Sequence, residues 1–136
     1  MTNKLPPAKD WRNRDIDDWN VVSFTEYLRD KHREQFGIEY APMRSWRMEQ
    51  GQIGRLIGTR TKEGTHSKAM VKRFIDEAFA SYTPTAQYPG TNFGFIYSYR
   101  RNLLQRIEAE ASEKKRLKER MESVEDVDYT DLSEWL

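Results

Sequence analysis

The sequence predicts an all-α protein, built as a compact bundle of three short helices plus one long C-terminal helix, with flexible termini. Apolar residues recur every three or four positions in four segments, and a residue able to cap a helix stands near the start of three of them. No segment alternates apolar and polar residues with the β-branched content of a strand. The 136 residues are enough for one hydrophobic core and too few for two ordinary domains.

Four regions are expected along the chain. Residues 1–19 form a flexible N-terminal lead, residues 20–107 the helical body, residues 108–123 a projecting charged helix, and residues 124–136 an acidic tail. Two tryptophans of the lead are large enough to dock back onto the core. They are Trp11 and Trp19.

The first helix is expected to begin at a capping box. Ser23 followed by Glu26 has the required spacing, in which each side chain bonds the other residue's free backbone N–H. Gly37 supplies the C-terminal stop, because glycine adopts the left-handed conformation without strain. The apolar side of this helix consists of Phe24, Tyr27, Leu28 and Phe36.

Two further short helices follow at about residues 47–58 and 65–82. The first carries Met48, Ile53, Leu56 and Ile57. Thr65 or Ser67 can cap the second, which ends before Pro84 and whose apolar residues are Met70, Phe74, Ile75, Ala78 and Phe79. A polar, basic loop at residues 58–64 connects the two helices.

The longest helix is expected from a cap at Thr91 to about Met121. Its first half has an apolar stripe that we expect to pack on the core, comprising Phe93, Ile96, Tyr97, Leu103, Leu104 and Ile107. Beyond Ile107 the stripe is lost, so the second half should project into solvent. Glu110 and Lys114 interrupt the heptad pattern, which argues against a long coiled coil.

The net charge of +1 conceals a strong partition. Between residues 44 and 73 eight basic residues accompany only two acidic ones, a local net charge of +6. A segregated basic patch attracts polyanions even when the total charge is near zero, although charge runs are often ordinary solvated helix faces. We therefore expect nucleic-acid contacts from Arg44, Arg47, Arg55, Arg60, Lys62, Lys68, Lys72 and Arg73.

Aromatic residues beside cations offer a second feature of nucleic-acid binding. Tyr97, Tyr99, Arg100 and Arg101 have the composition of a surface that stacks single-stranded bases. Aromatic residues at helical spacing are more often part of a core, and for Phe93 and Tyr97 we expect the core.

Motifs for enzymatic chemistry are missing from the sequence, and a non-enzyme is expected. The glycines near residue 58 lack the Gly-Lys-Ser/Thr sequence of a phosphate-binding loop. His32 and His66 are the only histidines and have no metal-ligand spacing, so neither a metal nor a cofactor is expected. We expect His32 on the surface, and His66 either as a loop residue or near a phosphate.

Two nucleic-acid motifs match incompletely. Gly51-Gln-Ile-Gly54 fits the Gly-x-x-Gly loop of KH domains, but the strands of that fold are not predicted. The connection at residues 58–64 is longer than the turn of a helix-turn-helix. Sequence-specific reading of a DNA groove is therefore not expected.

Composition indicates a cytoplasmic protein. No cysteine is present, which excludes disulfides and thiolate metal sites. The N-terminal residues lack the apolar stretch of a signal peptide, and no apolar run approaches the length of a membrane span. We expect no membrane partner.

The last residues combine acidic and large apolar side chains. No basic residue follows Arg120, whereas six of the following residues are acidic. The apolar side chains are spaced by three and four, so they share one face of a helix, as in a docking peptide. We expect the partner-docking residues to be Tyr129, Leu132, Trp135 and Leu136.

Two resemblances follow from these segments. The order Ile53-Gly-Arg-Leu-Ile57, Val71-Lys-Arg-Phe-Ile-Asp-Glu-Ala-Phe79 and Tyr88-Pro-Gly-Thr-Asn-Phe-Gly-Phe95 resembles small helical accessory proteins of phage replication and transcription. The tail Thr130-Asp-Leu-Ser-Glu-Trp-Leu136 is similar to the peptides by which phage late-transcription coactivators bind the sliding clamp. That likeness implies Leu132, Trp135 and Leu136 as anchors in an apolar pocket.

We therefore expect a phage-type accessory factor of transcription or replication. Its basic body would contact DNA or a nucleic-acid enzyme, and its tail would dock a sliding clamp or an RNA polymerase subunit. One alternative is an inhibitor or anti-host protein that binds protein and ignores DNA, and another is a structural role through self-association of the long helix. The acidic tail could also mask the basic face until a partner binds it.

Overall fold

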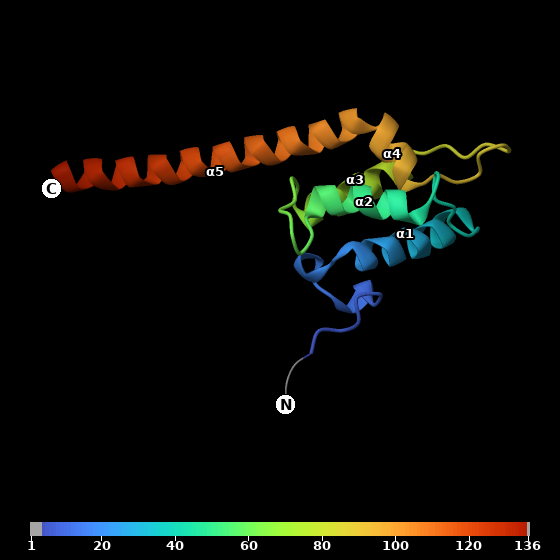
Figure 1. Ribbon diagram of the computed structural model, residues 1–136. Coiled ribbons are helices and arrows are strands. Elements are labelled where there is room, and N and C mark those ends of the chain that lie inside the picture. Colours follow the sequence, from blue (N-terminus) through green and yellow to red (C-terminus); the bar gives the residue numbers. More distant parts are fainter. Residues whose placement is uncertain (1–3, 136) are drawn as a thin grey trace. The chain divides into compact units, whose positions relative to one another are not determined.

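The computed structural model describes residues 4–135, and side chains through residue 124. Two compact units are present, Met1–Leu104 and Gln105–Leu136. All the named elements are helical and no strand occurs in the described part of the chain, which confirms the all-α class (Figure 1). The elements are the 3-10 turns η1 (Trp11–Asn13) and η2 (Ile16–Asp18), and the α-helices α1 (Val21–Phe36), α2 (Trp46–Ile57), α3 (Lys68–Ala80), α4 (Phe93–Tyr99) and α5 (Arg101–Trp135).

Helix α1 begins earlier than the sequence predicts. Its cap is Asn20, whose Oδ1 accepts the backbone N–H of Ser23 at 3.1 Å. The hydroxyl of Ser23 accepts the backbone N–H of Asn20 at 3.1 Å, so Ser23 is the third residue of the helix and not its cap. The C-terminal stop at Gly37 is confirmed, with a left-handed φ of 72°.

The expected N-terminal lead contributes to the core. Trp19 is 3% exposed and its ring meets those of Phe24 and Tyr27 at 5.0 and 5.1 Å. Trp11 donates from its indole N–H to the Asp30 carboxylate at 2.8 Å. Aromatic side chains of η1 and of the residue that follows η2 therefore cover one side of α1.

Helices α2 and α3 lie where the sequence predicts them, within a few residues at each end. Serine hydroxyls cap both, because Ser45 accepts the N–H of Met48 and Ser67 accepts the N–H of Met70, each at 3.1 Å. Helix α2 packs on α1, α3 and α4, and α3 packs on α2, η2 and α4. Their buried apolar residues are Ile53, Leu56, Val71, Phe74, Ile75, Ala78 and Phe79.

The predicted long helix is two helices. Asn92, rather than Thr91, caps α4 by accepting the N–H of Phe95 at 2.8 Å. Arg100 leaves the helical conformation with φ −118° and ψ 32°, and α5 restarts at Arg101. The three-short-plus-one-long arrangement is therefore incomplete, because a fourth short helix precedes the long one.

Within the second unit, the helical backbone of α5 continues past the expected end at Met121 to Trp135. After Ile107, which is 1% exposed, the described side chains are exposed or half-exposed. The searched helices include none with the length and apolar character of a membrane span.

Candidate nucleic-acid interface and aromatic pocket

The eight basic residues expected to contact nucleic acid fall into three groups. Four lie around the loop that joins α2 to α3, two lie at the opposite end of α2, and two lie on α3. The first group is Arg55, Arg60, Lys62 and Lys68, the second is Arg44 and Arg47, and the third is Lys72 and Arg73. A helix of twelve residues is about 18 Å long, so the first two groups are separate surfaces.

The loop of the first group is a small hairpin, which we call the basic hairpin (residues 58–64). An antiparallel bridge pairs Gly58 with Glu63, and the N–H of Thr59 donates to the carbonyl of Lys62 at 2.8 Å. Gly58 has a φ of 92°, which favours glycine. A Cβ on Gly64 would lie 2.4 Å from the Gly58 nitrogen. These two glycines therefore allow a tight backbone turn at the base of the hairpin.

The basic hairpin presents its cations to solvent. Arg55, Arg60 and Lys62 are exposed, and none of them forms an ion pair with a described residue. Lys68 is half-buried and donates to the carbonyl oxygen of Asp17 at 2.8 Å. Beneath the turn lies a cavity of about 580 Å³, whose lining includes Arg60, Lys62 and Lys68.

The two cations of α3 are engaged in ion pairs along the helix. Lys72 contacts Asp76 at 2.8 Å and Arg73 contacts Glu77 at 3.1 Å. Burial raises the pKa of Asp76, but hydrogen bonds from Lys72 and Tyr27, together with the charge of Lys31, outweigh burial and bring this pKa below its usual value. Lys72 and Arg73 therefore differ from Arg55, Arg60 and Lys62, which form no ion pair with a described residue.

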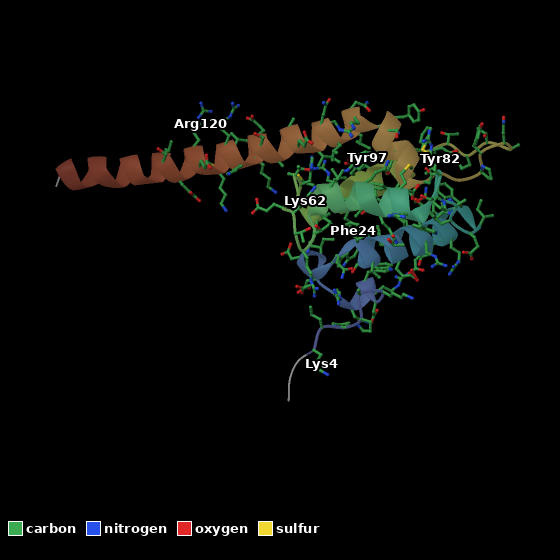
Figure 2. All side chains as sticks on the ribbon, in the orientation of Figure 1. Lys4, Phe24, Lys62, Tyr82, Tyr97 and Arg120 are labelled. Atoms are coloured by element: carbon green, nitrogen blue, oxygen red, sulfur yellow. The ribbon has the colours of Figure 1, made fainter. Side chains whose placement is uncertain are left out.

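A pocket opens at the other end of α2, near Arg44. Its volume is about 660 Å³, and four aromatic residues line it together with Met43 and small polar residues. We call this the aromatic pocket, with Tyr82, Tyr88, Phe95 and Tyr99 as its rings. Lys62 and Tyr82, both labelled in Figure 2, lie at opposite ends of the helical body.

Sequence reasoning identified only part of this pocket. Tyr99 was expected beside cations and is 65% exposed, whereas the expected core residue Phe93 is fully buried and stacks on Tyr97. The feature of the sequence that indicates this pocket is the charge pattern. Residues 78–99 contain no charged side chain, in a protein of which 33% is charged.

A buried carboxylate supports the inner wall of the aromatic pocket. Glu49 of α2 is fully buried, and its Oε2 accepts the backbone N–H groups of Met43 at 2.9 Å and Gly94 at 3.0 Å. Its Oε1 accepts the hydroxyl of Tyr40 at 2.5 Å. Burial first, and then the Glu49 charge, raise the pKa of Tyr40 well above its ordinary value.

The expectation of a surface position for His32 is wrong. His32 is 2% exposed and its ring lies 4.8 Å from that of Phe36 and 5.3 Å from that of Tyr40. Its Nδ1 lies 3.0 Å from the carbonyl oxygen of Ile38, and its Nε2 faces Gly90, where an added Cβ would approach to 2.2 Å. The residues next to His32 in the sequence are charged, which favours a surface position. They lie on the other faces of α1, however, and the His32 ring faces the core.

Other chemical alternatives find no support in the geometry. Gly51 and Gly54 lie inside α2, so they form no Gly-x-x-Gly loop of the KH kind. The described residues contain no group of three side chains suited to hold a metal ion. His66 lies beside the hairpin, where its Nδ1 is 2.7 Å from the Thr65 hydroxyl. The expected docking side chains Tyr129, Leu132, Trp135 and Leu136 lie outside the described side chains.

Comparisons with known proteins give no family for this chain. No family model, curated protein or solved structure matches it.

Proposed function

We propose that this protein is a non-enzymatic accessory factor of transcription or replication, of the kind encoded by phages. The basic hairpin contacts the phosphates of nucleic acid, and the acidic, apolar tail at residues 128–136 docks a protein such as a sliding clamp or an RNA polymerase subunit. The two contacts reinforce each other, because binding at one raises the effective concentration at the other.

The observation that carries this proposal is the exposure of cations on a rigid turn. Arg60 and Lys62 stand on a hairpin closed by a bridge and by two glycines, and neither is neutralised by a described acid. Cations held this way approach a phosphate without giving up an existing ion pair. Lys68, at the start of α3, lines the same cavity as Arg60 and Lys62, and Arg55 lies in the last turn of α2 before the hairpin.

The test is the salt dependence of binding to duplex DNA, measured by fluorescence anisotropy. The intact protein should lose affinity steeply with salt, since cations that bind phosphates release counterions. A double variant, Arg60→Ala with Lys62→Ala, should bind more weakly. It should also lower the slope of log K against log salt by about one for each phosphate that is no longer neutralised.

A matched control changes the same net charge elsewhere. Lys114 and Lys115 are exposed on α5, and the variant with both changed to alanine should keep the slope of the intact protein. Equally weakened binding in the two double variants would mean that net charge, and not the hairpin, attracts DNA. No DNA binding at all, with a protein partner still captured, would favour the alternative of an inhibitor that acts on protein alone.

A further inference from the structure

We infer that the aromatic pocket is a binding site for an unpaired base of single-stranded nucleic acid. This site is distinct from the basic hairpin, because it lies at the opposite end of α2. It goes beyond the proposed contact with phosphates, since it recognises the uncharged, planar part of the nucleotide.

The first argument is the exposure of flat rings. Tyr88 is 63% exposed, Tyr99 is 65% exposed and Phe95 is 40% exposed, and all three line one pocket. The rings of Phe95 and Tyr99 lie 5.1 Å apart. Aromatic faces left in solvent at this density are platforms on which bases stack in single-strand-binding proteins.

The second argument is the chemistry of the lining. The pocket has ligand-binding size and no charged residue lines it. Hydroxyl groups of the lining can provide donors and acceptors for a base edge, from Thr83, Tyr88, Thr91 and Tyr99. Those of Tyr82 and Thr85 already bond to the backbone of Tyr88 at 2.7 and 2.9 Å. The Thr91 hydroxyl has no hydrogen-bond partner among the described residues, which is unusual for a residue only 5% exposed.

The third argument is the charge of the residues that directly follow lining residues in the sequence, which is positive, whereas the Glu49 carboxylate behind the inner wall is fully buried. Arg44 directly follows Met43 of the lining, and Arg100 directly follows Tyr99. The Arg100 guanidinium donates to the Ser81 hydroxyl at 3.2 Å, which places this cation beside Tyr82. No acid occurs between residues 78 and 99. An uncharged ring system with cations next to it complements a base joined to phosphates.

The experiment measures anisotropy of a fluorescent poly-thymidine oligonucleotide and of a duplex of equal length. Tyr88→Ala and Tyr99→Ala should each weaken oligonucleotide binding by about fivefold to 150-fold, the range expected when one base has no ring to stack on. The Tyr88→Phe and Tyr99→Phe variants keep the ring and should keep most of the affinity. Ultraviolet cross-linking of the intact protein should attach thymidine to peptides within residues 81–100.

Folding does not confound this test, because both tyrosine rings are exposed and thermal unfolding of each variant provides the check. The double variant Arg60→Ala with Lys62→Ala distinguishes a failure of this inference from a failure of the proposed function. Tyrosine variants that lose oligonucleotide affinity while retaining duplex affinity support the base site, even where the hairpin variant leaves duplex binding unchanged. Unchanged oligonucleotide affinity in both alanine variants would overturn the inference. The inference would also be overturned if these variants lost affinity for an acidic, aromatic peptide and not for the oligonucleotide.

Discussion

The carboxylate of Glu49 accepts a hydrogen bond from the hydroxyl of Tyr40 at 2.5 Å, and both side chains are buried. The same hydroxyl accepts the backbone N–H of Phe93 at 2.7 Å. Through these bonds one acidic side chain of α2 fixes the segment before α2 and the start of α4. The walls of the aromatic pocket therefore depend on a residue that does not line it.

Replacing Glu49 should destabilise the protein strongly. Glu49→Ala leaves the Tyr40 hydroxyl and the N–H groups of Met43 and Gly94 without their acceptor, and each buried unpaired group costs about 1–3 kcal/mol. We expect a decrease of about 3 kcal/mol or more in the free energy of unfolding, measured by urea titration. The exposed Glu119→Ala variant should remain within about 0.5 kcal/mol of the intact protein. A similar value for both would show that the buried network contributes little.

Two glycines should respond in opposite directions to alanine. A Cβ on Gly90 would lie 2.2 Å from His32 Nε2, and the His32 ring is held by Phe36 and Tyr40. Gly90→Ala should therefore cost about 1–3 kcal/mol by overpacking. Gly51 lies inside α2 with nothing within 4 Å of an added Cβ, so Gly51→Ala should stabilise by up to about 1 kcal/mol. Thermal unfolding compares the two, and destabilisation by both would contradict the packing argument.

Tyr27 should contribute, along with buried Tyr40, to a fall in stability at alkaline pH. Burial first, and then its hydrogen bond to Asp76, raise the pKa of Tyr27 well above the ordinary value of about 10. Because the pKa is higher in the folded state, the protonated phenol contributes its full stabilisation at pH values below the pKa of the unfolded state. This stabilisation is lost as the pH rises from about 10 toward the pKa of the folded state. Tyr27→Phe should flatten this decline in urea unfolding above about pH 10, whereas Tyr99→Phe should follow the intact protein. An unchanged slope for Tyr27→Phe would exclude this phenol as the cause.

The acid side should depend on Asp76. Its pKa lies below the usual value, so its contribution to stability is present above about pH 4 and is lost as the pH falls through the folded pKa. Asp76→Asn should lower the free energy of unfolding at neutral pH and reduce its dependence on pH in the acid range. Asp15→Asn, at an exposed position, is the control and should retain the dependence. An acid profile unchanged in Asp76→Asn would place the titrating group elsewhere.

Removal of the tail should abolish partner capture and leave folding intact. Deletion of residues 128–136 removes Trp135, and buried tryptophans are common hot spots of interfaces, so Trp135→Ala should weaken binding by about 2 kcal/mol or more. Pull-downs with a purified sliding clamp and with RNA polymerase measure this, and thermal unfolding checks the fold. Capture that survives the deletion would refute the docking tail.

Much of the fold was predictable because local rules determine it. Gly37, Ser67 and the apolar spacing of α2 and α3 act within a few residues, and the structure confirms them. The start of α1 was misplaced because Ser23 fits two positions of a capping box, as the cap or as the third residue. The break between α4 and α5 at Arg100 was not predicted, because no proline or glycine stands at that position to indicate it.

The candidate sites were less predictable, because they depend on contacts between distant segments. Nothing in the sequence distinguishes Glu49 from a surface acid, since its donors include an N–H 45 residues away. His32 looked polar among its neighbours, although its ring enters the core. The basic segment at residues 44–73 is visible in the sequence. Its division into three groups is not, because it depends on where α2 begins and ends and on the acids one helical turn beyond Lys72 and Arg73.

The distance along the chain between Glu49 and its donors has a consequence for biosynthesis. A ribosome completes α2 well before it has made Phe93 and Gly94, so the nascent chain carries a carboxylate whose burial is not yet compensated. The body can adopt its final packing only after α4 has emerged, and a chain that stalls earlier exposes the apolar faces of α1, α2 and α3. Quality-control proteases recognise such surfaces, so truncated products should be cleared, while chains that include α4 can complete this packing.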